Sequence, residues 1–170
     1  MAEKLSSSPC VYPACTLRVP CVTNGKTMVY TVPKIWGVAV ARIFSDRSRR
    51  NLEGVHPKLV ECCEMALQTS EVDFTVIEGT RTLERQKEYV ARGVSKTLKS
   101  YHLIQPDGYG HAVDLYPYYN GSVQVDAPAK FWRMIAEAMK GAAEELGIRI
   151  TWGGDWKSFV DTPHYQLETK

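Results

Sequence analysis

The sequence predicts an α+β fold, a small and mainly antiparallel sheet with helices packed on one side of it. Residues 73–77 and 148–152 are short runs rich in β-branched or aromatic residues, which are typical of strands. Residues 57–69 and 126–146 instead repeat apolar residues at helical spacing, so each run predicts a helix with one buried face. Helices and strands of these lengths can bury their apolar sides against one another in one core.

Capping and turn residues separate these elements along the chain. Pro57 suits the first turn of a helix, because its missing N–H would have no partner there. Thr82 can cap a helix over residues 83–92, and a glycine follows that segment as helix ends often require. Gly147 ends the longest helix in the same way, and residues 164–167 form the last predicted strand.

Length and composition predict one main domain with an added segment. A chain of 170 residues is long enough for a substantial core. Four prolines within residues 1–43 break any long helix, so we expect a weakly structured extension or a small added element there. Residues 44–170 form the domain that carries the chemistry.

Charge and cysteine content exclude several classes of protein. The net charge is only +2, so no nucleic-acid partner is predicted, and no apolar run is long enough for stable membrane association. The five cysteines are an odd number and two are adjacent, which does not resemble a disulfide framework. No signal peptide is visible, and we therefore expect synthesis in the cytoplasm.

The stretch from Ser100 to Asp114 (SYHLIQPDGYGHAVD) is the first candidate site. Asp114 is a single acid between apolar residues, as on a short strand, and the loop before it is dense in turn formers. That loop can bring His102 back beside Asp114. A neutral imidazole and a carboxylate are ligands that zinc accepts.

A second stretch, residues 161–167 (DTPHYQL), supplies the remaining groups. His164 opens an alternating segment and would be the third zinc ligand, while Asp161 precedes it by three positions. Three protein ligands with an open fourth position are typical of catalytic zinc, and a nearby carboxylate can act as general base. His111 competes with His102 as a ligand, but it lies three residues before Asp114 and would face the other side of a strand.

These motifs resemble a known family. Residues 100–102 with 110–114 are similar to the SxHxxGxAxD signature of the M15 (VanY/VanX-like) zinc peptidases, whose fold is also called D,D-peptidase/hedgehog-like. Residues 78–82 (EGTRT), residues 152–156 (WGGDW) and the acid-x-x-His motif at 161–164 resemble further segments in the same order, over roughly residues 44–170. The resemblance is nearest to phage L-alanyl-D-glutamate peptidase endolysins. One departure is a longer loop, whose extra residues fall within Ile104 to Tyr109.

The resemblance implies a zinc metallopeptidase that hydrolyses the L-alanyl-D-glutamate bond of the peptidoglycan stem peptide. Zn²⁺ would be held by His102, Asp114 and His164, and Asp161 would be the general base. Arg81, which by itself would suggest a surface salt bridge, would stabilise the oxyanion. The alternatives are a D-alanyl-D-alanine dipeptidase or carboxypeptidase, and a non-catalytic zinc-containing module that binds the wall.

Other predictions concern the rim of the site and the setting of the enzyme. We expect a set of residues with polar or aromatic side chains to lie behind the ligands or at the rim of the substrate cleft: Ser100, His111, Trp152, Asp155 and Trp156. We expect a monomer that acts on the bacterial cell wall after release. If the protein belongs to a phage, the resemblance implies that a holin opens its way through the membrane.

Overall fold

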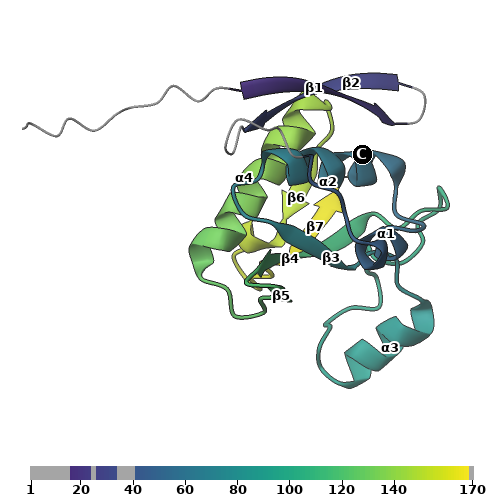
Figure 1. The fold of residues 1–170 in the computed structure, drawn as a ribbon. Coiled ribbons are helices and arrows are strands. Elements are labelled where there is room, and N and C mark those ends of the chain that lie inside the picture. The colour runs from purple at the N-terminus through teal and green to yellow at the C-terminus, as the bar shows by residue number, and fades with distance from the viewer. Residues whose placement is uncertain (1–15, 24–25, 34–40, 169–170) are drawn as a thin grey trace, which may run out of the picture. The chain divides into compact units, whose positions relative to one another are not determined.

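The computed structural model describes residues 16–23, 26–33 and 41–168 (Figure 1). The chain divides into two compact units, Met1–Ala41 and Arg42–Lys170. In the first unit, β1 (Thr16–Thr23) and β2 (Lys26–Pro33) pair as an antiparallel hairpin. The role predicted for this segment, an addition without catalytic function, stays a prediction.

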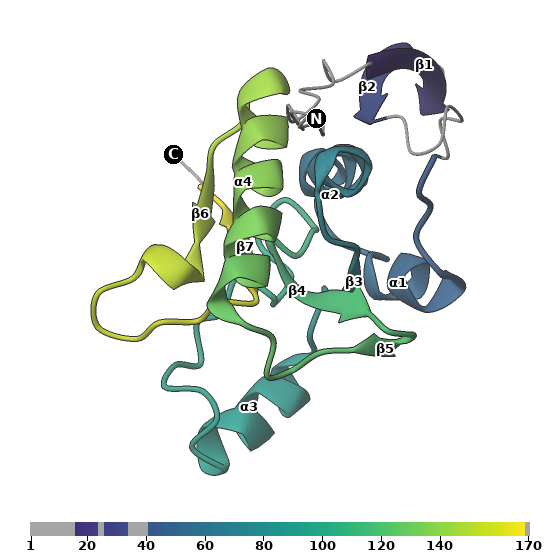
Figure 2. The same cartoon turned by 60° about the vertical axis from the view of Figure 1, so that its left-hand side comes forward.

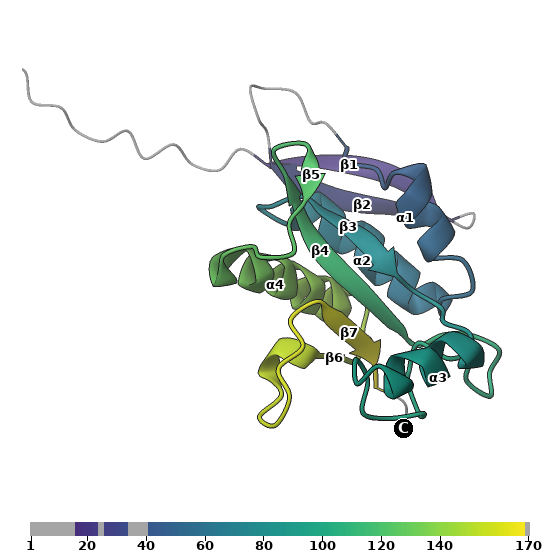
Figure 3. The ribbon, with the colours of Figure 1, turned by 90° about the horizontal axis from the view of Figure 1, so that it is seen from below.

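The second unit contains five strands in one antiparallel sheet. They are β3 (Phe74–Glu78), β4 (Ala112–Tyr119), β5 (Ser122–Val123), β6 (Ile150–Trp152) and β7 (His164–Leu167). The strand order is β3-β4-β7-β6. β5 lies outside this order and forms a short hairpin with the last residues of β4. Figure 3 shows β4 as the long strand between β3 and β7. β4 and β7, which carry the predicted Asp114 and His164, are therefore direct neighbours.

The helices of this unit are α1 (Asp46–Asn51), α2 (Pro57–Thr69), α3 (Leu83–Ala91) and α4 (Ala129–Glu145), and a single 3₁₀ turn, η1, covers Gly153–Asp155. α2 and α4 pack side by side, and α4 also contacts β4 and β6 (Figure 2). This arrangement of a small antiparallel sheet with helices confirms the predicted fold class. None of the helices in the described part of the chain combines the length and the apolar character that a membrane crossing needs.

The core lies between α2, α4 and the sheet. Leu59 of α2, Ile135 of α4 and Leu115 of β4 are fully buried. Cys62 and Cys63 are both fully buried. The Cys62 thiol donates to the carbonyl of Met139 at 3.4 Å, which joins α2 to α4.

The longest helix begins three residues later than predicted, at Ala129. Trp132 is buried in it, whereas Phe131, its neighbour in the sequence, is only partly covered. The Trp132 indole donates to the carbonyl of Ala127 at 3.0 Å, and its ring packs edge-on against Tyr116. This bond ties the buried face of the helix to the turn before it and places Trp132 toward the sheet.

Candidate metal centre

The register of the sheet places the two candidate strand ligands opposite each other. Asp114 of β4 pairs with His164 of β7, and on its other side Asp114 pairs with Glu78 of β3. Residues directly opposite in adjacent strands project to the same face of a sheet. Alternation along β4 turns Val113 and Leu115, both fully buried, to the other face. The sheet therefore holds three ionisable side chains in one row.

His102 reaches this row from the loop before β4. Its ring Nδ1 lies 2.6 Å from the carbonyl oxygen of Gly79, and its own carbonyl accepts the N–H of Arg81 at 2.8 Å. Ser100 Oγ also accepts the His102 N–H at 3.3 Å, so the serine helps to hold this loop. His102 is 2% exposed. These bonds attach a loop residue to the end of β3 and fix the direction of its ring.

The three candidate ligand atoms form a nearly equilateral triangle. His102 Nε2 lies 3.2 Å from His164 Nδ1, and Asp114 Oδ1 lies 3.3 Å from each of these nitrogens. Ligands at zinc-to-nitrogen and zinc-to-oxygen distances of about 2.0–2.1 Å in a tetrahedron are separated from one another by about 3.3 Å. The spacing of the triangle thus fits a tetrahedral metal ion with one position left open.

The outer ring nitrogens support the same interpretation. When His102 Nδ1 donates to Gly79 and His164 Nε2 donates to Gln166 Oε1 at 3.0 Å, the inner nitrogen of each neutral ring carries only a lone pair. Asp114 adds a carboxylate oxygen to them. Three acceptors then converge with no donor between them, an arrangement that requires a cation. Hydrogen bonding of the outer nitrogen is also what orients histidine ligands in metal sites.

The electrostatics of the centre favour ionised Asp114. Burial by itself would raise the pKa of this carboxyl, but interaction with His102 and His164 brings it well below its ordinary value. For His164, burial lowers the pKa, yet hydrogen bonding and charge interaction with Asp114 raise it overall. Positive charge at the centre is thus favourable, and it can be supplied by protons or by a metal ion.

Asp161 lies beside this triangle in the turn that leads into β7. Its N–H donates to the carbonyl of Gly153 at 3.0 Å, and its carbonyl accepts the N–H of His164 at 3.2 Å. Burial and the negative charge of Asp114 raise the pKa of Asp161, although His164 and other positive groups oppose this. A carboxylate with a raised pKa, placed next to a metal centre, is suited to accept and return a proton.

Arg81 is close to the centre but is not a free cation. Its Nε and Nη2 bond to the two oxygens of Glu78 at 3.0 and 2.5 Å, and Nη1 bonds to Gln86 Oε1 at 2.6 Å. Its guanidinium lies over the ring of Tyr89, and its Nη2 is 4.0 Å from Asp114 Oδ2. Arg81 is thus held in a buried ion pair beside Asp114 and not in a salt bridge at the surface.

The predicted rim residues lie in different surroundings. The Trp156 ring is 5.2 Å from that of His164, next to the candidate ligand. Trp152 is buried, donates to the carbonyl of Thr162 at 2.8 Å, and therefore supports the turn that carries Asp161. Asp155 lies in the η1 turn, is exposed and pairs with Lys140 at 2.6 Å, so its carboxylate is directed to a lysine and not to a ligand histidine.

His111 lies away from the triangle, immediately before β4, as its spacing from Asp114 predicts. It belongs with Asp107 and His56 to a second group of three side chains whose ligand-type atoms lie within 4.8 Å of one another. No sequence motif pointed to His56. Its position directly before Pro57 could have indicated it, because the residue that precedes the first helical turn is the N-cap, whose side chain is held against the start of the helix.

Comparison with known proteins places the chain among peptidases. Residues 40–169 match the family model described as phage L-alanyl-D-glutamate peptidase. The chain is similar to the L-alanyl-D-glutamate peptidase of Escherichia phage T5, with 33% identity over 121 residues that cover 69% of this chain and 84% of the relative. It is also similar to the L-alanyl-D-glutamate peptidase of Listeria phage A118, with 31% identity over 61% of this chain and 33% of that protein.

A solved structure gives the same result. The crystal structure of the Serratia marcescens L-Ala D-Glu endopeptidase ChiX superposes with a TM-score of 0.66 and 44% sequence identity, covering 74% of this chain and 89% of that one. The family match includes the segments that carry the candidate ligands and Asp161. The chain therefore belongs to the phage L-alanyl-D-glutamate peptidase family.

Proposed function

We propose that this protein is a zinc-dependent peptidoglycan peptidase that hydrolyses the bond between L-alanine and D-glutamate in the stem peptide. Family membership supports the peptidase activity and this choice of bond. The observation that carries the metal is the triangle of His102 Nε2, Asp114 Oδ1 and His164 Nδ1, three converging acceptors at 3.2–3.3 Å. The substrate places its action at the bacterial cell wall.

In this proposal the chain has two tasks, to hold the ion and to move a proton. His102, Asp114 and His164 are the ligands, and Gly79 and Gln166 fix the two rings from outside. Zinc bound there would supply a Lewis acid that polarises the scissile carbonyl and lowers the pKa of a bound water toward about 7. A fourth coordination position would be left to the substrate and water.

Asp161 is the proposed general base and then the general acid. Its carboxylate takes a proton from the attacking water and returns it to the leaving amine nitrogen. Its raised pKa suits this double role, because a base of higher pKa takes the proton more readily and remains able to release it. Arg81 would add positive charge beside the developing oxyanion, although the ion pair with Glu78 balances much of that charge.

The test is digestion of purified peptidoglycan by the zinc-loaded protein, with and without a chelator, followed by mass spectrometry of the released ends. We expect new N-terminal D-glutamate ends that disappear when the metal is removed. Release of D-alanine or D-alanyl-D-alanine would assign the alternative peptidase activity. Reducing sugar ends that survive chelation would refute a zinc peptidase.

A variant separates the base from the ligands. Asp161→Asn removes the basic carboxylate but keeps the shape of the side chain, so we expect retained zinc and hydrolysis reduced by about 10²–10⁴-fold. Asp126→Asn makes the same change at an exposed aspartate and serves as the control. Unchanged activity of Asp161→Asn would remove Asp161 from the base role. Zinc binding to the wild type without any peptide hydrolysis would favour the wall-binding module.

A further inference from the structure

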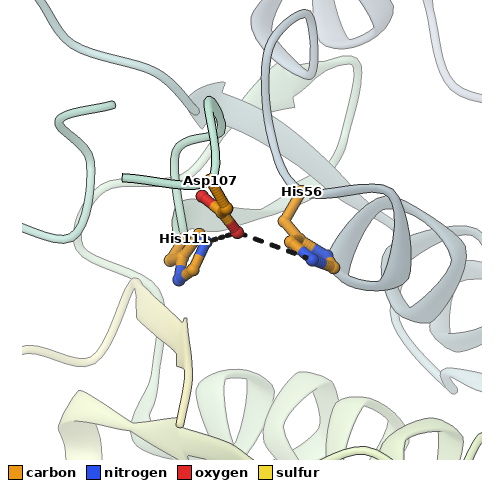
Figure 4. A group of neighbouring side chains, drawn as sticks. All are labelled: His56, Asp107 and His111. Atoms are coloured by element: carbon orange, nitrogen blue, oxygen red, sulfur yellow. Dashed lines mark hydrogen bonds and ion pairs between the residues drawn. The ribbon is translucent and has the colours of Figure 1, made fainter. Parts of the chain in front are cut away.

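Three side chains from separate parts of the chain meet outside the candidate centre (Figure 4). His56 is the N-cap residue of α2, Asp107 lies in the longer loop of Ile104 to Tyr109, and His111 directly precedes β4. Asp107 Oδ2 lies 2.7 Å from His111 Nε2 and 3.9 Å from His56 Nε2. Figure 4 shows the carboxylate between the two rings.

The donor set equals that of the candidate centre, two imidazoles and one carboxylate. His111 is 5% exposed, and its ring lies perpendicular to that of His56 with the ring centres 5.3 Å apart. Imidazole nitrogens and a carboxylate oxygen are donors that a borderline metal such as zinc accepts.

We propose that His56, Asp107 and His111 form a second metal site, which takes Zn²⁺ and ties the longer loop to the start of α2. The loop itself is compact, because the N–H of Gln105 donates to the carbonyl of Tyr109 at 2.8 Å and the N–H of Gly108 donates back to Gln105 at 2.9 Å. Holding Asp107 would consequently hold the whole loop.

A small movement of Asp107 brings its separations from the two histidines to the spacing of metal ligands. Ligand atoms around tetrahedral zinc are about 3.3 Å apart, a value midway between the 2.7 and 3.9 Å observed here. A shift of Asp107 by about 0.6 Å, away from His111 and toward His56, would make the two separations equal. The Asp107 side chain is 43% exposed, and its neighbour Gly108 has open space around it, so the loop can accommodate the shift.

The ring nitrogens that would point away from the metal, Nδ1 of His56 and of His111, indicate that this second site binds zinc more weakly than the first. For His111 to bind a metal through Nε2, the ring proton must move from Nε2 to Nδ1. Because Nδ1 has no hydrogen-bond partner among the described residues, this move breaks only the bond between Nε2 and Asp107, which the metal replaces. His56 Nδ1, however, accepts the N–H of Lys58 at 3.2 Å as part of the helix cap. Binding zinc through His56 Nε2 places a proton on Nδ1 and gives up that bond. We therefore expect two zinc ions of unequal affinity.

The experiment is a titration of the untagged, metal-free protein with zinc chloride, read by calorimetry and by metal analysis after gel filtration. The wild type should bind two equivalents, the second more weakly. Asp107→Asn and His56→Gln should each bind one, and Asp126→Asn, the matched exposed aspartate, should still bind two. A single equivalent in the wild type, or two equivalents in Asp107→Asn, would overturn the proposal.

A second measurement distinguishes this site from the candidate centre. In Asp114→Asn, which lacks a ligand of the first site, added zinc should still raise the melting temperature, and adding Asp107→Asn should abolish that rise. If zinc fails to stabilise Asp114→Asn although the variant is folded, the second site is refuted while the proposed function stands. Peptidoglycan hydrolysis by Asp107→Asn, with its first site loaded, should equal that of the wild type.

Discussion

Gly153 controls the position of the proposed general base, and replacing it with alanine should lower both catalysis and stability. A Cβ atom at position 153 would lie 2.4 Å from the carbonyl oxygen of Asp161 and 3.2 Å from the Cβ of His164. Both neighbours belong to the turn that carries the base and a ligand. Because the first contact is with backbone, no flexible side chain can move aside.

The magnitude follows from these distances. Real Cβ contacts are essentially never below 3.0 Å, so the turn must move by at least about 0.6 Å at Asp161. Since misplacement of a catalytic group by about 1 Å can cost about 10²-fold in rate, we expect hydrolysis to fall about 10- to 100-fold. Overpacking should cost about 1–3 kcal/mol of the free energy of unfolding.

The assay compares peptidoglycan hydrolysis, zinc content and denaturant unfolding for Gly153→Ala and for Gly141→Ala. Gly141 lies within α4, and a Cβ atom added there would meet nothing within 4 Å beyond its own helix. Alanine at this position should therefore stabilise the helix by about 0.5–1 kcal/mol and leave hydrolysis unchanged. Wild-type activity in a folded Gly153→Ala variant would refute the close packing of glycine against Asp161 as a determinant of catalysis.

Two further predictions concern zinc affinity and thiol reactivity. Gln166→Leu removes the acceptor that orients His164 and should weaken zinc binding about 10- to 100-fold in a chelator competition, whereas Gln166→Glu keeps an acceptor and should bind nearly as the wild type does. Burial raises the pKa of Cys62 to about 12 and that of Cys63 well above its ordinary value. Peptide mass spectrometry after iodoacetamide treatment should find both thiols unmodified in the native protein and modified after unfolding; rapid native labelling would contradict their burial.

Much of the fold could be predicted because its signals are local. The periodicity of residues 57–69 specified α2, and Thr82 caps α3 with its side chain accepting the N–H of Arg85 at 3.3 Å. Which of the neighbours Phe131 and Trp132 is buried could not be predicted, because both are apolar. Only the bond of Trp132 to Ala127 and its contact with the sheet decide that Trp132 is the buried one.

By itself, the sequence determined the residue types of the candidate centre, because the spacing of His102, Asp114, Asp161 and His164 resembles one family signature. Only the tertiary structure decided how these groups meet. The pairing of Asp114 with His164 depends on strand register, which arises from contacts between segments about 50 residues apart. The meeting of His56 with Asp107 likewise depends on a contact between distant segments, and local patterns carry no record of it.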